Sequence, residues 1–250
     1  MARFPIALPL AALVALATPA FADPIADALA DTTRPAADKD KDAARKPAAL
    51  IAFARIKPGQ HVVDFWTGSG YWARLFGKVV GPKGHVIAYV PAEIADFKNH
   101  PVDVAKAMAA EPGRGNVEAL SDPVAAMPPA DQQNTYDAVF LFENYHDLHN
   151  AYMKGADVGA INKGVFALLK HGGVYVIADH AAAAGSGLTH TADLHRIDPA
   201  TVKSEVLAAG FVLDGTTDVL ANPADPHTAG VFDPALRGNT DRFVMRFKKP

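Results

Sequence analysis

Short apolar runs alternate along the chain with longer segments in which apolar residues recur every three or four positions. The run 136–142, Tyr-Asp-Ala-Val-Phe-Leu-Phe, is the clearest predicted strand. The full set of predicted strands is 61–65, 85–90, 117–120, 136–142, 174–178, 211–213 and 242–247. Helices are predicted at 48–54, 71–80, 102–110, 158–169 and 199–209. This alternation indicates an α/β sheet with parallel crossovers, and the last two strands, which have no helix between them, should pair antiparallel at an edge.

The first 22 residues have the features of an export signal. Arg3 precedes an apolar run from about position 4 to 17, and Ala20-Phe21-Ala22 is a small-x-small cleavage site. Because the run is short for a membrane span, we expect a cleaved signal peptide at 1–22 and a periplasmic protein with no membrane segment after cleavage. The alternative is an uncleaved anchor.

The rest of the chain divides into a lead-in and one domain. Residues 23–46 are rich in Ala, Asp and Lys, and the charges at 38–42 are expected to be solvated. Residues 47–250 hold all of the predicted strands, without an internal repeat or a second-domain boundary. We therefore expect a polar lead-in at 23–46 and a single domain at 47–250.

Composition narrows the possible functions. Half of the 250 residues are hydrophobic and a fifth are charged, which is typical of a folded chain with a sizeable core. The 24 Lys and Arg residues nearly balance the 27 Asp and Glu residues, so charge gives no reason to expect nucleic acid or an anionic membrane as a partner. The chain has no cysteine, which excludes disulfides, thiolate metal sites and a cysteine nucleophile.

A glycine-containing turn follows the first predicted strand. It reads Asp64-Phe65-Trp66-Thr67-Gly68-Ser69-Gly70, and a predicted helix begins at Tyr71. Closely spaced glycines let a ligand approach the backbone, and a helix N-terminus presents free N–H groups. A carboxylate at the strand end can accept hydrogen bonds from a ribose or an amine. The turn indicates a ligand site, and the alternative is an ordinary strand–helix turn.

The order of elements, together with this turn, resembles that of class I S-adenosylmethionine-dependent methyltransferases over about residues 45–250. The Lys57-Pro58-Gly59 turn before the first strand and the run Leu168-Leu169-Lys170-His171-Gly172-Gly173 before the fifth also carry the resemblance. The resemblance implies a Rossmann-like, mostly parallel seven-stranded sheet in the order 3-2-1-4-5-7-6, with strand 7 antiparallel and helices on both faces.

A narrower resemblance is to a group of exported, predicted methyltransferases of bacteria. Trp66 and the stretches 195–198 and 237–243 are similar to that group. The resemblance implies S-adenosylmethionine as the cofactor. The residues assigned to it are Asp64, Trp66, Gly68, Gly70, Asp122 and Glu143.

The family's roles carry over to these positions unevenly. Asp64, Gly68 and Gly70 match the cofactor motif, and Asp122 follows the third strand, where the family often places an acidic side chain near the adenine amine. Two positions depart from the pattern. Trp66 replaces the first glycine, where a large side chain either crowds the cofactor or stacks on it. The second strand ends Tyr89-Val90-Pro91, without the family's acidic residue for the ribose hydroxyls, and Glu93 lies three positions beyond Val90.

Five of the ten histidines fall in two clusters that the predicted sheet brings together. His146 and His149 follow the fourth strand, and Asp179-His180 ends the fifth, with His190 and His195 in the loop beyond. Ligands of open α/β sheets bind outside the carboxyl ends of the strands, and strands 4 and 5 are neighbours in the implied order. We therefore expect His146, Asp147 and His180 at one mouth of the sheet.

Three interpretations of this histidine-rich edge remain open. One histidine is a general base, since imidazole titrates near neutral pH. Alternatively, His and Asp side chains bind a metal ion, which needs no thiolate. The third possibility is a set of loop histidines that only form hydrogen bonds. We assign His146, His180 and Asp147 as catalytic and assign no metal ligand.

The predicted function is methyl transfer from S-adenosylmethionine to a small-molecule acceptor. The Asn/Asp-Pro-Pro-Tyr motif of amino-group methyltransferases is absent after the fourth strand, which favours an oxygen or carbon acceptor over nitrogen. The alternative is a non-catalytic ligand- or metal-binding periplasmic protein that retains the methyltransferase fold.

Overall fold

The computed structural model describes residues 23–126 and 130–250. The predicted signal peptide at 1–22 lies outside the described residues, so its cleavage stays a prediction. Within the described ranges, no helix is both long enough and apolar enough to cross a bilayer.

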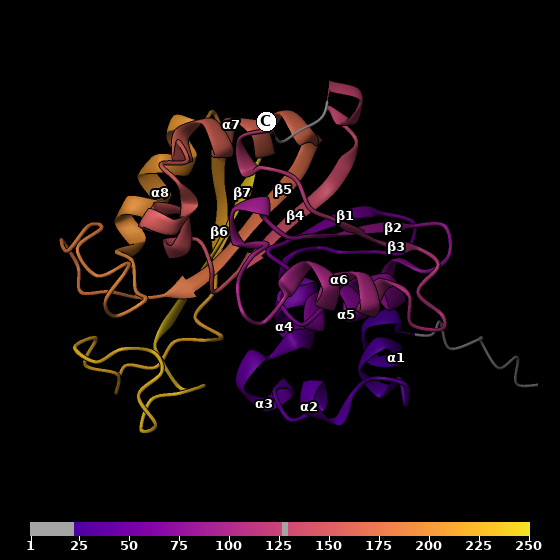
Figure 1. The fold of residues 1–250 in the computed structure, drawn as a ribbon, viewed down its shortest axis with the longest axis horizontal. Coiled ribbons are helices and arrows are strands. Elements are labelled where there is room, and N and C mark those ends of the chain that lie inside the picture. Colours follow the sequence, from indigo (N-terminus) through magenta and orange to yellow (C-terminus); the bar gives the residue numbers. More distant parts are fainter. Residues whose placement is uncertain (1–22, 127–129) are drawn as a thin grey trace, which may run out of the picture.

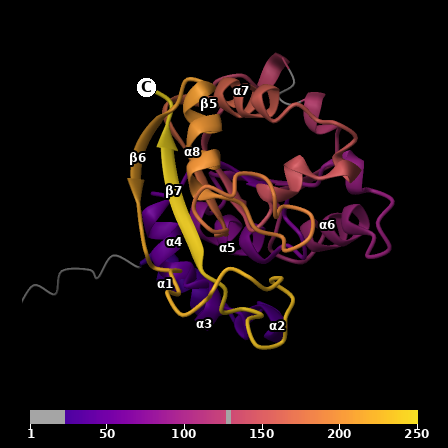
Figure 2. The ribbon, with the colours of Figure 1, turned by 90° about the vertical axis from the view of Figure 1, so that its left-hand side faces the viewer.

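A seven-stranded sheet forms the centre of the molecule (Figure 1). Its strands are β1 His61–Phe65, β2 His85–Tyr89, β3 Val117–Leu120, β4 Tyr136–Phe142, β5 Leu169–His180, β6 Val212–Thr216 and β7 Arg242–Lys248. They lie in the order β3-β2-β1-β4-β5-β7-β6. Strand β7 is antiparallel to both of its neighbours, and the other pairs are parallel. The order confirms the sheet implied by the resemblance, and the antiparallel pair β6–β7 confirms the predicted edge (Figure 2).

Helices cover both faces of this sheet. They are α1 Pro24–Ala30, α2 Ala36–Lys39, α3 Asp42–Arg45, α4 Pro47–Phe53, α5 Tyr71–Val80, α6 Pro101–Ala109, α7 Val158–Leu168 and α8 Pro199–Ala208, with short 3₁₀ helices at Ala92–Ile94, Val124–Ala126, Ala130–Gln132, His146–His149 and Ala151–Met153. Residues of α1, α4 and α5 pack on one face, and residues of α7 and α8 pack on the other. Successive strand side chains point to opposite faces, so Val62 and Val63 enter different cores. Burial on both faces explains why the strands are apolar throughout.

The fifth strand is longer than the sequence predicts. Residues 169–173 were expected to end a helix and form a turn, but β5 begins at Leu169, immediately after α7. The ladder with β4 is irregular between its Tyr136 and Ala138 pairings. Gly172 has a φ of +78°, and a Cβ atom on Gly173 would lie 2.8 Å from the Lys170 carbonyl oxygen. The two glycines therefore permit an irregular start of the strand where the pattern indicated a turn.

The lead-in at 23–46 packs on α5 through charged side chains. Arg34 forms a two-armed ion pair with Asp42, whose carboxylate also accepts a hydrogen bond from the Tyr71 hydroxyl at 2.6 Å. Asp38 is buried and lies 3.0 Å from Arg74. The expectation of a solvated charge run at 38–42 is therefore wrong for these two aspartates. Arg34 lies eight positions before Asp42 and Arg74 lies 36 positions after Asp38, so the charge run at 38–42 does not itself contain either partner.

Candidate functional site

A cavity of about 480 Å³ opens at the carboxyl ends of β1, β4 and β5. Its walls include Trp66, Thr67, Gly68, Ser69, Val90, Ile94, Asn99, Glu143, Asn144, His146, Asp147, Tyr152, His180 and His195. Residues that follow three different strands therefore face one space, as expected for an α/β sheet. We call the part formed by 66–69, Val90 and Ile94 the cofactor end, and the part formed by His146, Asp147, His180 and His195 the histidine end.

The two glycines of the turn have different surroundings. Gly68 lines the cavity with a φ of +56°, and a Cβ atom added to it would have no atom within 4 Å. Gly70 has a φ of +84°, and its Cβ atom would lie 2.5 Å from Cγ of Met108 on α6. Gly68 thus offers bare backbone to a ligand, whereas Gly70 allows α5 and α6 to approach each other.

Asp64 is the penultimate residue of β1, next to the turn, and is only 1% exposed. Its carboxylate accepts a hydrogen bond of 2.6 Å from the Thr67 hydroxyl. Burial raises the pKa of Asp64 to about 7, although the Thr67 hydrogen bond acts in the opposite direction. The residue is not part of the cavity wall, so it braces the turn from below.

Trp66 occupies a backbone conformation that favours glycine. Its φ is +73°, in the left-handed region that bulky residues rarely adopt. Its N–H and that of Thr67 both donate to the Tyr89 carbonyl oxygen at 3.0 Å, which fixes this geometry. The tryptophan side chain lines the cavity while packing partly against the core. Strained backbone of this kind is often found at functional sites.

The region after β2 places no carboxylate on the cavity wall. The Glu93 carboxylate accepts a hydrogen bond from the Val124 N–H at 3.0 Å. Asp122 is also absent from the wall, and its backbone carbonyl accepts a hydrogen bond from the Tyr89 hydroxyl at 2.6 Å. Val90 and Ile94 line the cavity here instead. The sequence assignment of Asp122 to the adenine amine therefore has no counterpart in the cavity wall.

Glu143 stands between the two ends, directly after β4. Its φ is +63°, and its N–H donates to the Ala178 carbonyl oxygen on β5 at 2.7 Å. Its carboxylate lies 2.7 Å from Arg242 and 3.8 Å from Arg45, which also lines the cavity. Glu143 is therefore a cavity residue, as assigned, but its charge is already paired.

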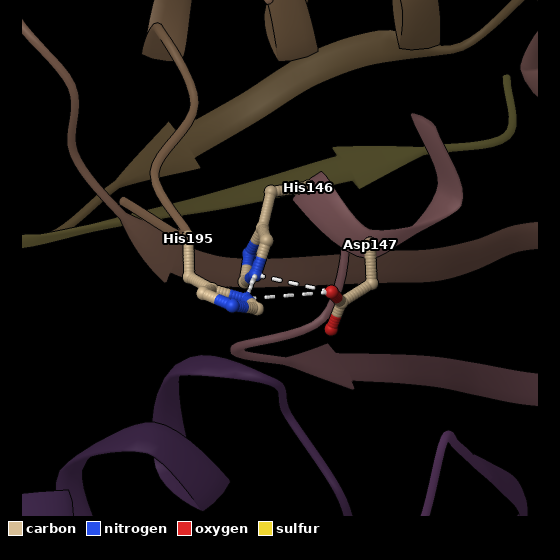
Figure 3. Close-up of side chains that lie close together, drawn as sticks. All are labelled: His146, Asp147 and His195. Atoms are coloured by element: carbon tan, nitrogen blue, oxygen red, sulfur yellow. Dashed lines mark hydrogen bonds and ion pairs between the residues drawn. The ribbon is translucent and has the colours of Figure 1, made fainter. Parts of the chain in front are cut away.

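His146 is the central residue of the histidine end and is only 2% exposed. Its Nδ1 lies 2.9 and 3.1 Å from the two carboxylate oxygens of Asp179, and its backbone N–H donates to the same carboxylate at 2.7 Å. On the other side, Nε2 lies 3.2 Å from Nδ1 of His195 and 3.3 Å from Oδ1 of Asp147 (Figure 3). Burial disfavours the imidazolium, but the charges of Asp179 and Asp147 outweigh burial and raise the pKa of His146.

Asp147 is held by a set of hydrogen-bond donors. Its Oδ2 accepts from Asn144 at 2.7 Å, and its Oδ1 accepts from Asn150 at 3.0 Å and from the Tyr152 hydroxyl. Burial would raise its pKa, but these bonds, with the neighbouring His195 and His146, lower the pKa of Asp147 to about 2. The carboxylate is therefore ionised and fixed in orientation.

His180 shares the cavity with His146, and their ring centroids are 6.2 Å apart. Its Nδ1 forms a 2.7 Å hydrogen bond with the Thr240 hydroxyl. Burial, which penalises the imidazolium, lowers the pKa of His180 to about 3. The structure thus brings His146, Asp147 and His180 together at one mouth, but the two histidines have opposite electrostatic environments.

His149 and His190 do not line the cavity. His149 shares a 3₁₀ turn with His146, but its Nε2 lies 3.2 Å from Glu205 on α8. His190 pairs with Asp193, whose side chain is exposed. Sequence reasoning assigned no role to Asp179 or His195, although it noted both. Asp179 could have been found from the sequence, because it is an acidic residue at the carboxyl end of a predicted strand. His195 lies in a loop and has a φ of +54°, which the sequence pattern does not predict.

Comparison with known proteins agrees with this architecture. No family model matches the chain. Over 115 residues it is 30% identical to a protein-L-isoaspartate O-methyltransferase of Ignicoccus hospitalis, a match that covers 46% of this chain and 50% of that protein. The chain therefore spans about half the length of this curated relative.

Solved structures match over most of the chain. A methyltransferase from Aquifex aeolicus that depends on S-adenosylmethionine superposes with a TM-score of 0.58 at 19% identity, covering 88% of this chain and 100% of that one. Another, from Mesorhizobium loti, has a TM-score of 0.57 at 14% identity and covers 83% of this chain and 99% of that one. Together with the strand order, these matches show that the chain has the Rossmann-like fold of class I S-adenosylmethionine-dependent methyltransferases.

Proposed function

We propose that this protein transfers a methyl group from S-adenosylmethionine to an oxygen or carbon of a small-molecule acceptor. The observation that carries the proposal is a single cavity that joins the open glycine turn at Gly68 to the buried His146–Asp179 pair. The curated relative and the Aquifex aeolicus and Mesorhizobium loti structures are named as methyltransferases, which supports the same activity.

The cofactor end suits a ligand with both polar and apolar parts. S-adenosylmethionine supplies a methyl group on a positively charged sulfur. The bare backbone at Gly68 and the hydroxyl of Ser69 offer polar contacts, while Trp66 and Ile94 offer apolar surface. The cavity volume of about 480 Å³ is within the range of roughly 300–1,000 Å³ of small-molecule sites.

The histidine end suits activation of the acceptor. The Asp179 carboxylate can only accept a hydrogen bond, so Nδ1 of His146 donates to it, and Nε2 then presents an electron pair toward Asp147 and His195. The acceptor must lose a proton from the atom that receives the methyl group, and His146 is a cavity residue whose imidazole can accept that proton. His180 is less suited to this role because burial lowers its pKa to about 3.

The remaining parts of the proposal rest on the sequence. We propose that the protein is exported to the periplasm and that its partner is a small molecule, because residues 1–22 have the pattern of a signal peptide and the charge balance gives no sign of a nucleic-acid partner. The mass of the N-terminal peptide from a periplasmic fraction tests export, and an intact Met1 on cytoplasmic protein would contradict it.

Calorimetric titration with S-adenosylmethionine tests the proposal. Gly68→Val should abolish binding, because a side chain then occupies the space beside the bare backbone. Gly187→Val is a matched control, since Gly187 has a φ of +57° and also has no atom within 4 Å of an added Cβ, but it lies outside the cavity wall. Both variants carry the same backbone strain of about 1–2 kcal/mol. A wild type that binds no S-adenosylmethionine at millimolar concentration would favour the non-catalytic alternative.

A further inference from the structure

Three potential metal-ligand atoms converge at the histidine end (Figure 3). They are Nε2 of His146, Oδ1 of Asp147 and Nδ1 of His195, and they are separated by 3.2, 3.3 and 3.7 Å. Ligand atoms about 2.1 Å from a tetrahedral ion lie about 3.4 Å from one another, whereas adjacent ligands of an octahedral ion lie about 3.0 Å apart. The three atoms therefore match one face of a tetrahedral coordination sphere.

The hydrogen bonds around these atoms leave one ring nitrogen of His146 facing the other two atoms. Nδ1 of His146 is bonded to the buried Asp179 carboxylate, so Nε2 is the nitrogen that faces Asp147 and His195. Its neighbour Oδ1 of Asp147 is a carboxylate oxygen that also accepts hydrogen bonds from Asn150 and Tyr152. This pair of atoms attracts a cation, either a proton on Nε2 or a metal ion between them.

The charges of the histidine end also call for a cation. The side chain of Asp179 is fully buried and that of Asp147 is 9% exposed. Within the described part of the chain, both carboxylates form ion pairs with histidines alone, and neither has a lysine or arginine partner. Buried charges in proteins are paired or bind metals. A divalent ion would balance both carboxylates.

The surrounding residues have the arrangement of outer-shell partners in metal sites. Metal-binding histidines usually donate their other ring N–H to a carboxylate, as His146 does to Asp179. Metal-binding carboxylates are themselves hydrogen-bonded, as Asp147 is by Asn144 and Asn150. The His195 ring is held at 5.0 Å from the Phe232 ring, on a backbone with a φ of +54°. Strain of this kind persists where the surrounding structure enforces it.

We propose that His146, Asp147 and His195 bind one Zn²⁺ ion whose fourth position opens on the cavity. Imidazole and carboxylate ligands in a tetrahedral set suit zinc, whereas Mg²⁺ prefers six oxygens. Three protein ligands and an open position are typical of a catalytic rather than a structural zinc site. Asp179 is then a positioning residue, because it acts through His146.

The ion narrows the acceptor class to a hydroxyl oxygen. Held by these three residues, a zinc ion would lower the pKa of a hydroxyl oxygen bound at the fourth position. His146 would then serve as a ligand instead of the base, and the hydroxyl proton would pass to water near neutral pH. Phe97, Tyr152 and Phe232 also line the cavity, which favours a ring-bearing phenol or enol over a sugar. The zinc site rests on its own geometry, whereas this role in acceptor activation rests on the proposed methyl transfer.

Zinc titration of the chelator-treated protein tests the site. We expect one ion per chain in the wild type, and Co²⁺ in its place should give the strong visible absorption of a tetrahedral complex. His195→Ala should weaken Zn²⁺ binding more than 100-fold, beyond the roughly 10–100-fold loss expected of the positioning variant Asp179→Asn. The His195 side chain is 31% exposed, so this variant should still fold, as its melting temperature without zinc would show.

His190→Ala is the matched control, because His190 lies in the same loop but outside the cavity wall, and it should leave Zn²⁺ binding unchanged. Absence of zinc binding, or equal binding by wild type and His195→Ala, would overturn the proposal. Titration with S-adenosylmethionine on the same samples separates the two conclusions. Zinc binding without S-adenosylmethionine binding would contradict only the methyl transfer, and the reverse would contradict only the zinc site, leaving His146 as a direct base.

Discussion

The two ends of the cavity are built in opposite ways. The cofactor end consists of backbone at Gly68, apolar side chains such as Ile94, and the ring of Trp66, while the carboxylate of Glu93 is bonded to Val124 away from the cavity. The histidine end contains titratable side chains that are mostly buried, and each is held by hydrogen bonds or ion pairs to neighbouring side chains. Ligand binding should therefore depend mainly on shape at the cofactor end and mainly on charge at the histidine end.

Two buried aspartates show the consequence. Burial raises the pKa of Asp64 to about 7, because its hydrogen bond from Thr67 only partly offsets the loss of solvent. Asp147 experiences the same penalty, yet its histidine and amide neighbours lower its pKa to about 2. Burial alone therefore does not set the charge of a buried carboxylate in this protein, and the nearby donors decide it.

The largest expected effect concerns His146. His146→Ala should lower turnover by about 10²–10⁴-fold, because it removes the group that activates the acceptor, while affinity for S-adenosylmethionine should hold. Turnover is measured as S-adenosylhomocysteine released with a phenol that the wild type methylates. His149→Ala is the control, since His149 shares the same turn but contacts Glu205 outside the cavity. Equal losses of turnover in the two variants would mean that the loss comes from disturbing the shared 3₁₀ turn and not from removing the His146 imidazole.

A pH-dependent effect is expected of Asp64. Its folded pKa of about 7 exceeds the ordinary value of 3.8, so the folded state holds a proton that the unfolded state releases between those values. Stability from this group is therefore lost as pH rises from about 4 to 7. Asp64→Asn should be more stable than wild type by up to about 4 kcal/mol at pH 8 and nearly equal at pH 3.5. Denaturant unfolding at both pH values measures this, and a larger gain at low pH would reverse the conclusion.

Replacing Trp66 tests whether its ring stacks on the cofactor or crowds it. Position 66 has a φ of +73°, which glycine adopts readily, so Trp66→Gly should not strain the backbone. If the ring stacks, its loss should weaken S-adenosylmethionine binding by about 0.5–1.5 kcal/mol, or roughly 2–13-fold. Calorimetry gives the affinity, and tighter binding by the variant would mean that the ring crowds the site.

The smallest effect is expected of the acidic residues near the cofactor end. Glu93→Gln and Asp122→Asn should each change S-adenosylmethionine affinity by less than about twofold, because neither residue lines the cavity. Both variants should fold with melting temperatures close to that of wild type. A tenfold loss in either variant would show that its carboxylate turns toward the ligand on binding, and would make the two ends of the cavity more alike.

Much of this architecture could be predicted from the sequence. Continuous apolar runs located the strands, and the lack of a helix between the last two predicted their antiparallel pairing. Parallel strands end at the same edge of a sheet, and the strand order implied by the resemblance makes strands 4 and 5 neighbours. Together these placed His146, Asp147 and His180 at one cavity. Local periodicity located the elements, whereas the strand order came from the family resemblance and was confirmed by the structure.

Other features were decided only by the tertiary structure. His195 joins His146 from 49 positions away, Arg74 neutralises Asp38 across two helices, and Glu93 turns to Val124. Each of these contacts depends on the path of a loop or on the direction of a long side chain. The positive φ of Trp66 is likewise set by the tertiary structure. Hydrophobic periodicity fixes which face an element buries, but it carries no information on the direction of polar side chains beyond the ends of the strands. The partners of buried charges in this protein are therefore set by packing between distant segments rather than by the local sequence.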